Sequence, residues 1–412
     1  MSIFKLAFRN VLRNKRRSLI TILAITLGFM AIDLFGGYMA AVFRTLKDAV
    51  VFGEGLGHLT IFKKGFLEEG KINPQRYLIT AEEQMALQGL LKQNQSVHEI
   101  MPRLDVAGLV SNGTMSTIFT AQGVRPELHA KMIAGTGQAL PQSQGRTISV
   151  DAPTGVLMGS DLAKMLDAKL DDTVVMMANT LAGQMNALDI QARGIFNTGM
   201  AATNDKFMVV PLNLAQSLYD TESVDRLTLL IDDISQAEKV RTWLLDKTPG
   251  IRFEPDVKTW EELSAFYTQV RSFYGMLFAF IFCIVLMIVV TSVVNTMTMS
   301  VVERTQEIGT LRALGMRQRL VIRLFAAEGA VIGMLGVGVG FVGTVAVTLV
   351  VSALGITYAP PGTATATPLE VDLVPSIWFL SGLFLVLLSV AAAVIPSVRA
   401  SRLSIVDAFG HV

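Results

Sequence analysis

Residues 303–315 read ERTQEIGTLRALG, a polar segment between two of the most apolar stretches of the chain. The spacing predicts a short helix that has Ile308, Leu311 and Leu314 on one side and displays its charged residues elsewhere. Gly315 is suited to cap the C-terminal end of that helix. From these residues alone two alternatives stay open: a solvated helix resting on lipid, or a knob that inserts into a partner protein.

The composition predicts a membrane protein with a water-exposed part. Of the 412 residues 51% are hydrophobic and 17% are charged, and the mean hydropathy is +0.49. Four apolar runs reach the roughly 20 residues that a spanning helix needs. These predicted spans are 19–43, 273–299, 320–356 and 376–396. A net charge of +1 gives no reason to expect a nucleic-acid partner.

The positions of Lys and Arg predict the orientation of the spans. Residues 1–18 carry basic side chains and no acid, and arginines recur in the link 300–318 and in the tail 397–412. We therefore expect both termini and the link on the cytoplasmic side, with 44–271 and the loop 357–375 outside. The first 18 residues have the pattern of an amphipathic helix lying on the inner leaflet, and an uncleaved anchor is favoured over a signal peptide.

The long segment after the first span is predicted to form an α+β domain. Residues 57–64 alternate as a strand does, and Thr80 with Glu83 forms a capping box that opens a helix. Ser160 is expected to cap another helix, and the loop 135–155 is a candidate boundary between two lobes. Further expected elements are strands at 114–124, 187–196, 206–211 and 224–232 and an amphipathic helix at 235–247.

The sequence lacks the motifs of an enzyme or of a cofactor-binding protein. No GxxxxGK[ST] loop is present, so the chain is not expected to bind ATP by that device. Its four histidines are scattered without metal-ligand spacing, and Cys283 is its single cysteine. We therefore expect a non-catalytic chain that binds no metal and no cofactor.

Small residues recur at helical spacing in the third span. Gly329 and Gly333, and again Gly336 and Gly340, form small-xxx-small pairs that permit close helix packing. Packing within one subunit and a seam between two subunits are both compatible with these pairs.

Two carboxylates lie inside predicted spans, where an isolated charge is costly. Asp33 is expected to face a wet cavity, to be protonated, or to have a partner. Glu328 is expected to pair with Arg323 or with a neighbouring chain.

Several separated segments resemble one family. RNVLRNKRRSLITILAITLG (9–28), ERTQEIGTLRALG (303–315) and IPSVRASRLSIVDAF (395–409) are similar to signature segments of ABC-transporter permeases of the FtsX, MacB and lipoprotein-releasing LolC/LolE type. In the outside domain, GVLMGSDLAKMLDAKLDDTVVM (155–176) and ARGIFNTGM (192–200) resemble the LolC/LolE-like branch. The resemblance implies a MacB-like permease fold in the bacterial inner membrane: four transmembrane helices, with a large extracytoplasmic α+β domain, here periplasmic, between helices 1 and 2.

The resemblance implies that 303–315 is a coupling helix seated on a separate cytoplasmic ABC ATPase dimer, which binds ATP and Mg. A second permease copy is also implied, in a homodimer or a LolC/LolE-like heterodimer. The candidate ATPase-coupling residues are Glu303, Arg304, Gln306, Glu307, Ile308, Gly309, Leu311, Arg312 and Gly315.

The lipoprotein-releasing branch further implies a lipid or lipoprotein cargo, a cavity for its acyl chains and a periplasmic carrier. The candidate cavity residues are Asp33, Phe35, Met39, Phe43, Phe273, Met276, Leu277 and Phe280. Ordinary lipid-facing or packing positions are the alternative for these residues. Pro141 is a candidate for the carrier-recruiting hook of that branch. Two other functions stay open: a MacB-like efflux permease, and an FtsX-like mechanotransmitter that controls a cell-wall hydrolase.

Overall fold

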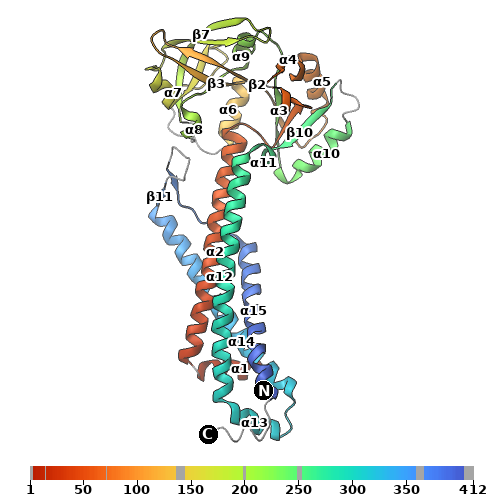
Figure 1. Ribbon diagram of the computed structural model, residues 1–412, viewed down its shortest axis with the longest axis vertical. Helices are drawn as coiled ribbons and strands as arrows, with labels where there is room; N and C mark the ends of the chain where they lie inside the picture. The colour runs from red at the N-terminus through yellow and green to blue at the C-terminus, as the bar shows by residue number, and fades with distance from the viewer. Residues whose placement is uncertain are drawn as a thin grey trace. The chain divides into compact units, whose positions relative to one another are not determined.

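A computed structural model describes residues 3–13, 15–70, 72–135, 144–197, 201–247, 253–358 and 366–402 (Figure 1). The chain divides into two compact units. The helical unit comprises Met1–Arg44, Val270–Ile356 and Pro368–Val412, and the sheet unit comprises Thr45–Gln269 and Thr357–Thr367. Pro141, the predicted hook position, lies outside the described residues.

Long apolar helices dominate the helical unit. It contains all or most of each of the helices α1 (Ile3–Arg13), α2 (Lys15–Asp48), α12 (Ala265–Glu303), α13 (Thr305–Ala313), α14 (Gln318–Leu354) and α15 (Pro375–Arg402). Within the described part of the chain, α2, α12, α14 and α15 are long and apolar enough to cross a membrane, which confirms the four predicted spans. Helices α2, α12 and α15 extend beyond the predicted spans at both ends, whereas α14 begins two residues before its predicted span and ends two residues before the end of that span. Because α2 already begins at Lys15, the predicted amphipathic helix is confined to α1.

The glycine pairs of α14 lie at close contacts between helices of the same chain. A Cβ added at Gly329 or Gly333 would lie 2.8 Å or 3.1 Å from atoms of α15. At Gly336 or Gly340 it would lie 2.7 Å or 2.9 Å from atoms of α2. The two pairs therefore let α14 approach α15 on one side and α2 on the other.

The strands of the sheet unit form one connected network. They are β1 (Leu59–Lys63), β2 (Val97–Ser111), β3 (Ser116–Val124), β4 (Gln144–Gly145), β5 (Gly155–Gly159), β6 (Thr173–Asn179), β7 (Met185–Phe196), β8 (Phe207–Pro211), β9 (Arg226–Ile231) and β10 (Pro255–Thr259). Helices and short turns between them are η1 (Ala49–Gly53), α3 (Phe66–Glu69), α4 (Pro74–Tyr77), α5 (Ala81–Leu91), α6 (Pro126–Gly135), α7 (Ser160–Met165), α8 (Ala201–Asn204), α9 (Leu212–Tyr219), η2 (Ile234–Gln236), α10 (Ala237–Lys247) and α11 (Trp260–Leu263). The two short strands β11 (Thr357–Tyr358) and β12 (Thr367–Pro368) pair separately.

Strand β2 belongs to two parts of this network. On one side the pairings β2–β3, β3–β8, β8–β5, β5–β7, β7–β6 and β6–β2 close into a ring. On the other side β2 pairs with β9, followed by β1 and β10. The two parts therefore share a strand of 15 residues rather than being separate lobes joined by the loop 135–155.

Of the two predicted N-terminal helix caps in the sheet unit, one is confirmed and one is wrong. The predicted capping box is confirmed: Thr80 Oγ1 accepts from the Glu83 N–H, and the Glu83 carboxylate accepts from the Thr80 N–H. The predicted Ser160 cap is wrong, because Gly159 occupies the capping position and no side chain caps the helix. Ser160 Oγ instead accepts from Asn204 Nδ2 at 2.8 Å.

Candidate functional site

The polar link is a short helix with defined ends. Glu303 is the last residue of α12, and Arg304 leaves helical geometry (φ −112°, ψ 15°) before α13 begins. Thr305 Oγ1 donates to the carbonyls of Val301 and Val302, both at 3.0 Å, which ties α13 to the end of α12. Gly315 has φ +92°, a left-handed conformation typical of the residue that follows a helix. The predicted glycine cap is confirmed.

Of the three residues on the predicted apolar side of this helix, the structure describes the side chains of Ile308 and Leu314, and these two differ in burial. Ile308 is buried in the core of the helical unit, whereas Leu314 is 80% exposed. The difference arises because α13 ends at Ala313, so Leu314 lies past the last helical residue. The Leu311 side chain lies outside the described part of the structure. Leu314 is thus an exposed apolar residue at the tip of the link, and its exposure could not be read from the spacing.

Arg304 is held inside the chain by a buried carboxylate. Its Nη1 lies 2.9 Å from Glu328 Oε1, and the two side chains are 11% and 4% exposed. Asn10 Nδ2 donates to the same oxygen at 2.5 Å. The guanidinium also lies over the ring of Phe325, 5.7 Å from its centroid. Glu328 therefore joins α1, α14 and the start of α13, and its partners are Arg304 and Asn10 rather than the expected Arg323.

The two acids of the link pair with arginines near the N-terminus. Arg17 donates to Glu303, and Arg13 Nη2 lies 3.1 Å from Glu307 Oε1. The Arg13 guanidinium, followed by that of Arg304, holds the pKa of Glu307 below its usual range. Both pairs are partly exposed, so each contributes little to stability. They connect α13 and the end of α12 to α1 and the start of α2.

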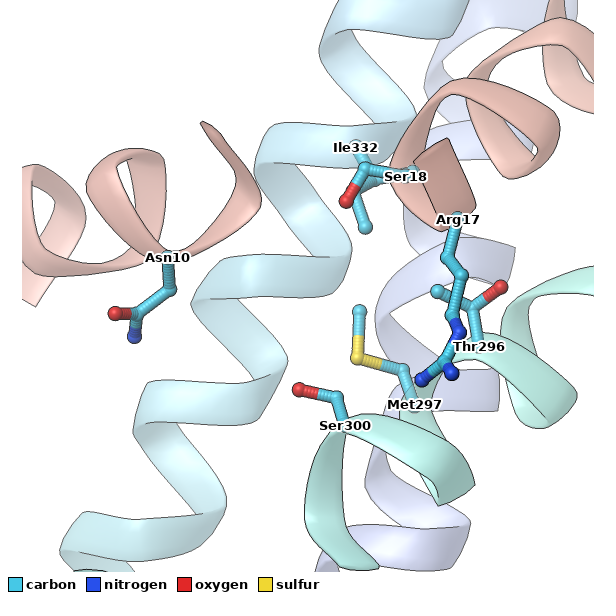
Figure 2. A pocket seen from close by; sticks show the side chains of 7 residues that line it. All are labelled: Asn10, Arg17, Ser18, Thr296, Met297, Ser300 and Ile332. Atoms are coloured by element: carbon cyan, nitrogen blue, oxygen red, sulfur yellow. The ribbon is translucent and has the colours of Figure 1, made fainter. Parts of the chain in front are cut away.

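A small pocket lies where these helices meet, as Figure 2 shows. Arg17 reaches toward Thr296 and Met297 of α12, and Thr21 shares a 2.6 Å hydrogen bond with Thr296. The residues that line the pocket are Asn10, Arg17, Ser18, Thr296, Met297, Ser300 and Ile332. Five of these seven residues have polar side chains, which suits hydrogen bonding between helices.

The other predicted coupling residues occupy different environments. Gln306 and Glu307 are exposed, Arg312 is half-buried, and Gly309 is buried. The exposed part of the link is therefore formed by its polar residues and by Leu314, while Arg304 and Ile308 attach it to the helical unit.

The predicted cavity residues do not form a single wall. Asp33 is buried on the side of α15, where Ser381 Oγ donates to its two carboxylate oxygens at 3.0 Å and 3.2 Å. Ser381 is therefore a partner of Asp33 within the chain, which was one of the three expectations for this residue. Asp33 thus lies apart from the aromatic residues of the same predicted set.

Aromatic side chains gather between α2 and α12. The ring of Phe35 lies 6.2 Å from that of Phe278 and 6.4 Å from those of Tyr38 and Tyr274, and Phe43 lies 6.1 Å from Tyr274. Met39 and Leu277 are half-buried.

Three further predicted residues face outward from α12. Phe273, Met276 and Phe280 are 54%, 63% and 65% exposed. They are spaced three and four residues apart, so they share one side of the helix. A stripe of exposed apolar side chains results, beside the aromatic cluster.

The residues described offer no metal site, since no group of three or more His, Cys, Asp or Glu side chains is close enough to hold an ion.

Two family models match the chain. The model of the FtsX-like permease C-terminal region matches residues 279–405, and that of the MacB-like periplasmic core domain matches residues 18–246. Together they cover the first span, most of the sheet unit and the remaining spans with α13.

Individual relatives agree with these models. The chain is 23% identical to the uncharacterized ABC transporter permease YknZ of Bacillus subtilis, covering 84% of this chain and 87% of that protein. It is 25% identical to the lipoprotein-releasing system transmembrane protein LolE of Haemophilus influenzae, covering 62% of each. Among solved structures, the periplasmic region of MacB from Actinobacillus actinomycetemcomitans is 16% identical, with a TM-score of 0.35, and covers 50% of this chain and 89% of that one.

Proposed function

The chain belongs to the family of ABC-transporter permeases that have a MacB-like periplasmic core domain and an FtsX-like C-terminal region, and from this we propose that it exports lipidated cargo. Members of this family are transmembrane components that work with cytoplasmic ATPases. In our proposal a separate ABC ATPase dimer binds ATP and Mg²⁺ and hydrolyses the nucleotide. The permease itself lifts a lipoprotein or another lipidated molecule from the outer leaflet and passes it to a periplasmic carrier.

We place the chain in the bacterial inner membrane with both termini in the cytoplasm. The basic residues near the ends of the spans support this orientation. Then α13 faces the ATPase, and the sheet unit is periplasmic.

In this proposal α13 receives the motion of the ATPase. Leu314, at the exposed tip of the link, enters the ATPase, and Glu307 lies at the edge of the contact. Arg304 acts as a positioning residue, because its guanidinium is bound to Glu328 of α14. A displacement of α13 is thereby passed to α14 through a buried ion pair as well as through the chain connection.

The observation that carries the choice of cargo is the exposed apolar stripe Phe273, Met276 and Phe280 on α12. Phe and Met side chains adapt to flexible acyl chains. Only 17% of the most apolar stretch of α12 is buried within the single chain, which leaves room for a second permease copy beside it. A homodimer or a heterodimer of the LolC/LolE kind would enclose the stripe in a cavity. The similarity to a lipoprotein-releasing protein supports this cargo.

Site-specific photocrosslinking tests the cargo. A photoreactive benzoylphenylalanine replaces Phe280 in the full chain in living cells, and the same residue replaces Phe379 as a matched control. Phe379 is 70% exposed on α15 and lies outside the stripe. We expect lipoprotein to be captured at position 280 several-fold more than at 379. Equal capture of bulk phospholipid at both positions, without lipoprotein, would show that the stripe only faces the bilayer.

A matched pair of crosslinkers tests the ATPase contact separately. A photoreactive residue in place of Leu314 is expected to capture an ABC ATPase, and one in place of Leu349, an exposed residue within α14, is expected to capture none. If no ATPase is captured at position 314 while lipoprotein is still captured at position 280, the proposed role of α13 is wrong. The proposed role of the stripe is then retained.

Efflux of a small molecule or peptide is the second candidate, favoured by the match of residues 18–246 to the MacB-like periplasmic core domain. Here an outer-membrane channel would replace the carrier. Mass spectrometry of proteins that co-purify in mild detergent distinguishes the two: a carrier and lipoproteins support release, and a channel supports efflux.

A further inference from the structure

A second pocket lies wholly inside the sheet unit. It is formed where η1 and α6 meet strands of the β-ring, β2, β3, β5, β7 and β8. Its lining residues are Phe52, Gly53, Gly55, Arg103, Gln122, His129, Leu157, Phe196, Phe207 and Val209. Polar and apolar atoms contribute about equally to this lining, and its polar side chains are those of Arg103, Gln122 and His129.

Arg103 is a buried cation without a carboxylate partner among the described residues. Its side chain donates to Gln122 Oε1 and, from Nη2, to the weakly accepting sulfur of Met132 at 2.7 Å, while its Nε has no partner in that part of the chain. Burial, reinforced by the nearby Arg226, lowers the pKa of Arg103 to about 9, so the guanidinium still carries its charge at neutral pH. A buried charge that lacks a counter-ion is costly and calls for compensation.

The nearest carboxylates are already bound to another arginine. Asp105 and Asp225 accept hydrogen bonds from Arg226 at distances between 2.8 Å and 2.9 Å. They act on Arg103 only through space. Among the described contacts, Arg103 therefore has no hydrogen bond to the carboxylates that partly balance its charge.

His129 is the second buried polar residue of the pocket. Its Nε2 is buried and has no partner among the described residues. Burial, followed by the charge of Arg103, lowers the pKa of His129 to about 4, which keeps the ring neutral near pH 7. A neutral imidazole donates one hydrogen bond and adds no second positive charge.

The backbone of Gly55 is shaped around the guanidinium. Gly55 has φ +75°, and a Cβ at this position would lie 2.1 Å from Arg103 Nη1. Only glycine combines this left-handed backbone with so close an approach. Phe196, Phe207 and Val209 form an apolar wall elsewhere in the pocket.

We propose that this pocket binds a compact monovalent anion, which is held by Arg103 and His129 and partly covered by the apolar wall. Chloride and the carboxylate end of a small ligand share this chemistry. The guanidinium supplies the counter-charge, and the imidazole supplies a further donor. The proposal does not depend on the cargo, since every residue in it lies in the sheet unit.

The test uses the full chain in non-ionic detergent, exchanged into a gluconate buffer of constant ionic strength. Chloride binding is measured as excess ³⁵Cl line width, and carboxylate binding as saturation transfer from the protein to butyrate. Gln122→Glu places a carboxylate beside the guanidinium and so supplies the counter-ion from within the chain. Gln184→Glu makes the same change at an exposed turn and is the matched control.

We expect a saturable signal from chloride or butyrate that weakens about tenfold or more in Gln122→Glu and is unchanged in Gln184→Glu. The anion that displaces the other at lower concentration identifies the source. Val209→Leu, which adds one methylene group to the wall, is expected to weaken binding several-fold and serves if Gln122→Glu does not fold. Full signal in the variants that fold, or no saturable signal with either anion, would overturn the proposal.

Discussion

Glu328 in the helical unit and Arg103 in the sheet unit are both buried ionisable residues, but their hydrogen-bond partners differ. In the helical unit Glu328 receives hydrogen bonds from Arg304 and Asn10, contributed by separate parts of the chain. In the sheet unit Arg103 has an amide and a thioether as neighbours. A buried charge that is paired within the chain acts as a structural joint between elements. A buried charge without a counter-ion can still bind a ligand. The following predictions test this difference, beginning with the largest expected effect.

Replacing Glu328 removes the joint of the helical unit. Glu328→Ala leaves the buried Arg304 with only the half-exposed Glu307 as a carboxylate partner, so we expect a loss of about 3–5 kcal/mol in the free energy of unfolding. Thermal unfolding in detergent measures the loss, and stimulation of the partner ATPase by the permease should fall with it. Glu328→Gln keeps an acceptor for Asn10 and should lose less. A loss below about 1 kcal/mol for the alanine variant would show that the pair is not a joint.

The buried histidine of the sheet unit should give stability a distinct pH dependence. Since the pKa of His129 is lowered to about 4 from an ordinary 6.5, the unfolded chain binds a proton that the folded chain does not between these values. Stability should therefore rise as the pH rises from about 4 to 6.5, by up to about 3 kcal/mol from this residue. The measurement is the difference in unfolding midpoint between wild type and His129→Gln across that range. A constant difference would mean that His129 is not buried in its neutral form.

Asp33 offers an intermediate case, a buried carboxylate whose partner is a neutral hydroxyl. Ser381→Ala removes the two contacts at 3.0 Å and 3.2 Å, and we expect a loss of about 1–3 kcal/mol. Ser401→Ala is a matched control, because the hydroxyl of Ser401 bonds to a backbone carbonyl of its own helix. Equal thermal midpoints for the two variants would argue that Asp33 does not need Ser381.

The exposed pair at the link should matter least for stability. Arg13→Ala removes one of the two arginine partners of the half-exposed Glu307, which also pairs with Arg304 at 3.1 Å, and we expect a change of about 0.2–1 kcal/mol that disappears in high salt. The matched variant Arg9→Ala removes an exposed arginine of the same helix. A large, salt-independent loss in Arg13→Ala alone would place this pair with the buried joint instead.

The sequence was sufficient where structure depends on near neighbours. The spans are visible in the sequence as apolar runs. The Thr80–Glu83 capping box depends on two residues that are only three positions apart, and the left-handed backbone after α13 is favoured by Gly315 itself. Ser160 and Leu314 show the limit of such signals, because a shift of one residue at a helix end changes what each side chain does.

Long-range partners could not be predicted. Asn10 and Glu328 are 318 residues apart, and the pairs of Arg13 and Arg17 with the link span nearly as many. The strand 97–111 contains Pro102 and charged residues that interrupt its alternation, so it was missed although it is central to the sheet unit. Arg103 likewise belongs to no motif; its burial follows from the position of β2 between β9 and β3.

The sharing of β2 has a consequence for protein engineering. Exchanging one half of the sheet unit with that of a relative would cut or re-pair a strand that carries hydrogen bonds to both halves, and a slip of one residue would turn inward-facing side chains outward in both at once. Chimaeras should therefore transplant the whole segment Thr45–Gln269, which contains the ten connected strands. Exchanges made within it between residues 135 and 155 should express poorly even when each half is taken from a stable parent.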